Sequence, residues 1–113
     1  MIAQIELQML PNQKLSVLLG ELECDIQLRQ MGSRLYLSLA VDNVEVFRNA
    51  ICTNAGPING ATVLEFPGVL FFLDTKGKES PQWEGLNDRW KLFYASNDEP
   101  IYKEIWDGWT VHA

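Results

Sequence analysis

The chain has 113 residues, 47% of them hydrophobic, with nine Lys and Arg against fifteen Asp and Glu. This length fits one domain with a single buried core, and the apolar content excludes a disordered chain. The net charge of −6 argues against nucleic-acid binding, which needs clustered basic side chains, unless folding gathers a local basic patch. The first residues lack the pattern of a signal peptide, and no apolar run is long enough to cross a bilayer. We therefore expect a soluble protein, intracellular where it is made, with no membrane contact.

Apolar and polar residues alternate in successive segments, which is the pattern of half-buried strands. In chain order, the predicted strands are 5–9, 15–19, 22–28, 35–41, 44–52, 69–74 and 90–95. Met31-Gly32-Ser33 joins the third to the fourth, so we expect these two strands to pair. The stretches 54–60 and 76–81 are rich in turn-forming residues and predict loops. Together these signals predict an all-β, mainly antiparallel domain over residues 1–95, either a small β-sandwich or a barrel.

Residues 96–113 follow a different pattern and are expected to form a C-terminal tail. Ser96 to Pro100 interrupts the strand pattern with residues that favour a helix start. Apolar side chains then recur at three- and four-residue spacing, at Ile101, Tyr102, Ile105, Trp106 and Trp109. We predict either a short helix from about Pro100 to Trp106 or an extended tail. So short a helix needs a surface to pack on, which is either the domain itself or a neighbouring subunit.

Few residues offer chemistry. Acidic side chains lie in or near predicted loops, the positions considered for a glycosidase pair, at Asp74, Glu79, Glu84, Asp88, Asp98 and Glu99. The single histidine, His112, is among the last residues of the sequence, so a Ser-His-Asp or Cys-His arrangement is not expected. Cys24 and Cys52 have no metal-ligand spacing and are expected to be buried free thiols, with a disulfide between them as the alternative. We expect no enzyme activity, no metal and no cofactor.

The tryptophans are the stronger candidates for a binding role. Trp90 starts the last predicted strand and is expected in the core. Trp83, Trp106 and Trp109 lie near loops or in the tail, where such side chains form sugar platforms or protein-contact hot spots. The predicted protein-contact residues are Trp83, Ile101, Tyr102, Ile105, Trp106 and Trp109. A carbohydrate-binding β-sandwich that uses these tryptophans is the alternative hypothesis.

A longer pattern carries a family resemblance. It consists of Leu28 to Leu39, then Asn54, Pro57, Phe66-Pro67-Gly68, Leu70, Asp74, Gly77, Pro81, Gly85-Leu86, Arg89 and Leu92. Its order and spacing resemble the small baseplate plug family of contractile-tailed bacteriophages, from about Ile2 to Tyr94. The resemblance implies a non-enzymatic virion protein at the central hub near the tail tube. It also implies contacts with baseplate, hub and tail-tube proteins, three or six copies in the assembled tail, and no direct contact with nucleic acid.

Overall fold

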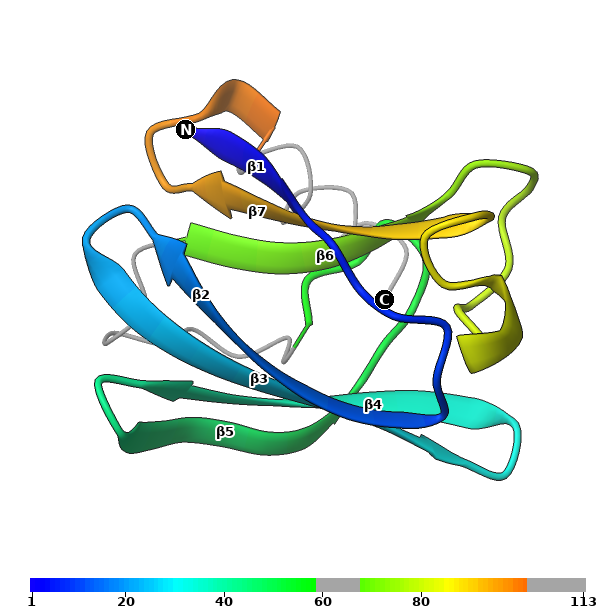
Figure 1. The fold of residues 1–113 in the computed structure, drawn as a ribbon. Helices are drawn as coiled ribbons and strands as arrows, with labels where there is room; N and C mark the ends of the chain where they lie inside the picture. The colour runs from blue at the N-terminus through cyan, green and yellow to red at the C-terminus, as the bar shows by residue number, and fades with distance from the viewer. Residues whose placement is uncertain (59–67, 102–113) are drawn as a thin grey trace.

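The computed structural model describes residues 1–58 and 68–101, whose strands form two antiparallel sheets (Figure 1). The four-stranded sheet has the order β2-β3-β4-β5, with bounds β2 Asn12–Leu19, β3 Leu22–Met31, β4 Arg34–Val41 and β5 Val44–Ile51. The three-stranded sheet has the order β1-β7-β6, with bounds β1 Ile2–Ile5, β7 Trp90–Ser96 and β6 Gly68–Asp74. A 3-10 helix, η1, spans Trp83–Gly85. The prediction of an antiparallel all-β fold is confirmed, and two separate sheets make it a sandwich.

Short turns fix the register of the four-stranded sheet. Gly20 and Gly32 have φ angles of 66° and 60°, and each is the first of two residues between paired strands. Positive φ at that position is what a tight hairpin turn of this kind requires. Asp42 and Asn43 connect β4 to β5 with φ angles of 50° and 67°, the pattern of a type I′ turn. The predicted pairing of β3 with β4 is confirmed.

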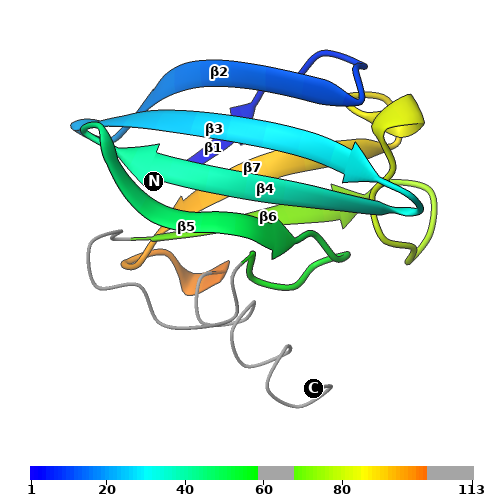
Figure 2. The ribbon, with the colours of Figure 1, turned by 90° about the horizontal axis from the view of Figure 1, so that it is seen from below.

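The two sheets bury one main core between them (Figure 2). Alternate residues of β3 and β4 point inward, and Leu28, Leu35 and Leu37 are fully buried. On β6, Leu70 and Phe72 enter the same core. Val69 and Phe71 point to the other side of β6 and form a second cluster with Ala95, against which Leu73, Phe93 and Ile101 pack. This is why β6 has apolar residues in succession: both of its faces are covered.

The predicted strand at 5–9 is wrong in its position. β1 spans Ile2–Ile5 and pairs with β7, whereas the chain leaves the sheet before Leu7. The backbone N–H and carbonyl of Leu7 bond to the side chain of Asn87 instead of a neighbouring strand. Met9, which alternation would place inside, is 49% exposed. Period-two apolar spacing therefore continued past the true end of the strand.

The remaining predictions on local structure have mixed outcomes. The other strands agree with prediction to within a few residues, and Trp90 is buried, as expected. The described part of the predicted loop 54–60 runs beside β6, because Ala55 and Ile58 donate backbone hydrogen bonds to it, at 2.8 and 2.9 Å. Of the predicted helix, Pro100 and Ile101 have helical backbone, and the rest lies outside the described residues. Residues 66 and 67, which belong to the pattern that carries the family resemblance, also lie outside the described residues.

Candidate interaction surfaces

The loop of residues 75–89, which joins β6 to β7, is held at its base by an ion pair between the buried carboxylate of Asp74 and the partly exposed Arg89. The side chain of Asp74 is 0% exposed and accepts hydrogen bonds from Nε and Nη2 of Arg89, at 2.8 and 2.7 Å. It also accepts backbone N–H groups of Lys76 and Glu79, both at 2.9 Å. The bonds from Arg89 hold the pKa of Asp74 well below its usual range, with help from the two backbone donors. Asp74 is therefore ionised at neutral pH, and its carboxylate holds the two ends of this loop together.

The same arginine stacks on a buried tryptophan. The guanidinium carbon of Arg89 lies 4.5 Å from the ring centroid of Trp90, a cation–π geometry. The indole N–H of Trp90 donates to the carbonyl of Glu79, at 3.1 Å. Gly85 lies so close to the Trp90 ring that a Cβ there would collide with it. The loop thus folds back over Trp90 at the start of β7 and covers this part of the core.

Two glutamines connect this loop to the other sheet. The side chain of Gln30, at the end of β3, donates to Oε1 of Gln82 at 2.9 Å and accepts the backbone N–H of Trp83 at 3.1 Å. Gln82 in turn donates to the carbonyl of Ser33 in the β3–β4 turn, at 2.7 Å. Asn87 makes the third connection, to the backbone of Leu7. We call residues 75–89, with these bonds, the loop clasp.

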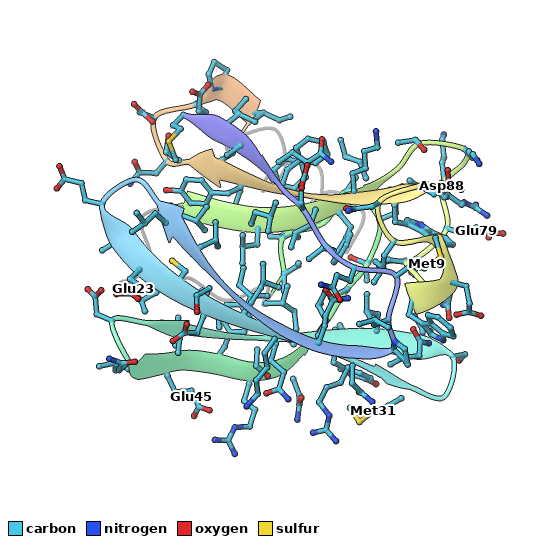
Figure 3. The ribbon with its side chains drawn as sticks, in the orientation of Figure 1. Met9, Glu23, Met31, Glu45, Glu79 and Asp88 are labelled. Carbon is cyan, nitrogen blue, oxygen red and sulfur yellow. The ribbon has the colours of Figure 1, made fainter. Side chains whose placement is uncertain are left out.

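The loop clasp fixes one end of the sandwich as a rigid surface. Figure 3 places Glu79, Asp88 and Met9 at this end, with Met31 nearby at the β3–β4 turn. Met9 and Met31 are 49% and 41% exposed, although both are large apolar side chains. A fixed surface that mixes apolar and charged groups suits contact with protein.

The predicted contact residues are only partly described. Trp83 is half-buried and packs against the main core, with its backbone N–H bonded to Gln30. Ile101 is half-buried and packs against the second cluster, so the structure does not bring these two residues together. Tyr102, Ile105, Trp106 and Trp109 lie outside the described residues. Their role in contacts stays a prediction.

The acidic residues of the loops serve mainly local contacts. Asp74 and Glu79 bond to Arg89, and Asp88 lies 3.4 Å from Nζ of Lys76. Among the described residues, no group of three or more His, Cys, Asp or Glu is placed to hold a metal ion. In the same residues, no helix has the length and apolar character needed to cross a membrane.

Burial governs the chemistry of both thiols. Cys24 and Cys52 are free and buried, as predicted. Burial, with smaller contributions from Asp42 and Asp25, raises the pKa of Cys24 to about 11. Burial alone raises the pKa of Cys52 further. Neither thiol is therefore ionised at neutral pH, and both act as small core side chains.

The outer face of the four-stranded sheet carries a shallow groove that the sequence analysis did not identify. The groove has a volume of about 630 Å³ and is lined by residues of all four strands. Its floor includes small side chains of β2 and β4, such as Ser16, Ser38 and Ala40, while Lys14 and Arg29 are among the larger lining residues. Polar residues at alternate positions did predict an outward face, but the groove depends on the pairing of four strands.

The fold and its contacts define a small structural β-sandwich, in which the polar bonds described above connect the loops at one end to each other. The chain matches the family described as cyanophage baseplate Pam3 plug gp18 over residues 2–98, and it belongs to this family. No match was found among curated proteins. Membership makes the chain a structural protein of a phage baseplate, located in the virion tail and in contact with other baseplate or tail proteins.

Proposed function

We propose that this protein plugs or braces the central hub of a contractile tail baseplate, next to the tail tube, through protein–protein contacts. The observation that carries the proposal is the family match over residues 2–98, which spans both sheets and the whole loop clasp. A plug has to keep its shape under mechanical load, and no chemical step is required of it.

The contacts of the loop clasp support this role physically. In a sandwich of two sheets, sliding of one sheet past the other is opposed by core packing and by cross-links at the ends. Here Gln30 and Gln82 bond the β3–β4 turn to the 75–89 loop, and Asn87 bonds the β1–β2 connection to the same loop. Segments from both sheets are thereby fixed in one surface. Such a surface can bind a neighbour without paying much ordering entropy.

The tail and the copy number belong to the same proposal. We propose that residues 96–113 dock on this domain or on a neighbouring subunit, with Tyr102, Ile105, Trp106 and Trp109 among the contacts. A position on the tail axis further implies repeated copies, three or six, to match the symmetry of hub and tube. Before assembly the protein would reside in the host cytoplasm.

The test is association with tail proteins. Purified protein should capture hub or tube proteins of the same phage, and mass spectrometry of isolated tails should find it in a fixed ratio to them. Failure to bind any tail protein, together with absence from intact tails, would overturn the proposal. The alternative of a carbohydrate-binding module is tested by titrating host glycans while following tryptophan fluorescence. A shift that W83A abolishes would favour the alternative.

A further inference from the structure

The outer face of the four-stranded sheet has its charges separated along the strands. Three basic side chains lie toward the β3–β4 turn, at Lys14, Arg29 and Arg34, and all are exposed. Acidic side chains lie toward the opposite end, and Figure 3 shows two of them, Glu23 and Glu45, at that end of the sheet. A chain with a net charge of −6 thus presents a local basic cluster.

The strand register brings the three basic residues together. Arg29 is paired with Tyr36 on one side and Asn12 on the other, so Lys14 and Arg34 are its diagonal neighbours on the adjacent strands. Diagonal neighbours on one face lie about 7–8 Å apart, within reach of long side chains. None of the three forms an ion pair with another described residue, whereas Arg48 on β5 pairs with Glu45 at 2.6 Å. The cluster therefore presents three positive charges that no ion pair among the described residues neutralises, and an acidic partner would supply the opposite charge.

The groove beside this cluster is lined by residues of all four strands of the sheet. Two of the three basic residues, Lys14 and Arg29, line it, and so do the polar side chains Gln27, Ser38 and Asn49. Neighbouring strands are about 4.8 Å apart, so a segment that crosses all four strands covers about 14 Å, or four to five extended residues. The polar lining offers hydrogen-bond donors and acceptors to such a backbone.

We infer that this face binds an extended acidic segment of a neighbouring tail protein, with its carboxylates on Lys14, Arg29 and Arg34. The inference rests on the proposed function, because it names the chemistry of one partner of the plug. Nucleic acid fits the face less well. Phosphate contacts that hold DNA need many clustered basic side chains, and three basic residues are few for that purpose.

The test uses a fluorescein-labelled oligoglutamate peptide and matched charge variants. K14E/R29E reverses the charge of two residues of the cluster, and K76E/K78E makes the same change of net charge in an exposed loop. We expect wild type to bind the peptide at low salt, and more weakly as salt increases. K14E/R29E should bind roughly tenfold more weakly, and K76E/K78E should stay close to wild type. Amide shifts in an NMR titration should fall on β2, β3 and β4.

Several results would overturn the inference. The inference fails if the peptide does not bind, or if K76E/K78E loses as much affinity for the peptide as K14E/R29E does. It also fails if a duplex DNA oligonucleotide binds more tightly through the same residues. Self-association that K14E/R29E abolishes would assign the face to a second copy instead. Thermal unfolding of both variants checks that they fold.

Incorporation into tails separates the two proposals. If wild type and K14E/R29E both enter tails equally, the acidic-partner inference fails and the plug role stands; if wild type does not enter, the plug role fails.

Discussion

Asn87 offers the sharpest test of the loop clasp, because one side chain satisfies two backbone groups far away in the sequence. Its Oδ1 accepts the N–H of Leu7 at 3.1 Å, and its side-chain N–H donates to the carbonyl of the same residue. In N87A both groups lose their partner at a position that is 6% exposed, at a cost of about 1 kcal/mol each. Asn87 also has a φ of 64°, where Ala costs about 1 kcal/mol more.

The expected loss in the free energy of unfolding of N87A is therefore about 3 kcal/mol. With an unfolding entropy of about 2.1 cal/mol/K per residue, this lowers the Tm by about 12 °C. Urea unfolding and calorimetry measure both quantities. The matched control is N43A in the exposed β4–β5 turn, where φ is 67° and no side-chain hydrogen bond is made to a described residue. N43A should lose only about 1 kcal/mol. Equal losses in N87A and N43A would refute the role given to the two hydrogen bonds.

Three further predictions concern the same end of the molecule and the core. Because the pKa of Asp74 is depressed in the folded state, its stabilising effect is present above its unfolded pKa of about 3.9 and declines as the pH falls below that value. D74N should flatten this acid loss in urea midpoints measured down to pH 2, whereas D98N, whose pKa is also lowered but whose side chain is exposed, should leave most of it; equal effects would contradict the assignment. G85A should destabilise by about 1–3 kcal/mol, since its Cβ overlaps the Trp90 ring, and an unchanged Tm would show that the ring moves aside freely. Cys52 should react with a thiol reagent only on unfolding, at a rate that rises with the concentration of denaturant; rapid reaction of the native protein at pH 8 would contradict its burial.

The hairpins and the core could be predicted from the sequence because their signals are local. Alternation along β3 and β4, with Gly32 between them, determines both the turn and the inward residues. At β1 the same rule gave the wrong position. The backbone of Leu7 makes its hydrogen bonds with the side chain of Asn87, which is 80 residues away in the sequence, and not with a neighbouring strand. Local periodicity contains no information about such a partner.

The contact surfaces were less accessible to sequence reasoning. Gln30 and Gln82 have no motif that marks them, and they meet only because the β3–β4 turn and the 75–89 loop lie at one end of the sandwich. The cluster of Lys14, Arg29 and Arg34 likewise arises from register across three strands. The sequence shows nine scattered basic residues, and pairing of the strands is what gathers three of them. Tryptophan content, the clearest sequence signal for binding, led to Trp83, which is half-buried in the loop clasp.

The central claim is that this chain is a structural part of a phage baseplate. Cryo-EM of intact contractile tails from the phage that encodes it tests this most directly. The account predicts density for a two-sheet sandwich with the β1-β7-β6 and β2-β3-β4-β5 orders at the baseplate hub, in three or six copies. A complete baseplate, resolved well enough to trace every subunit, with no density that fits this sandwich would contradict the account.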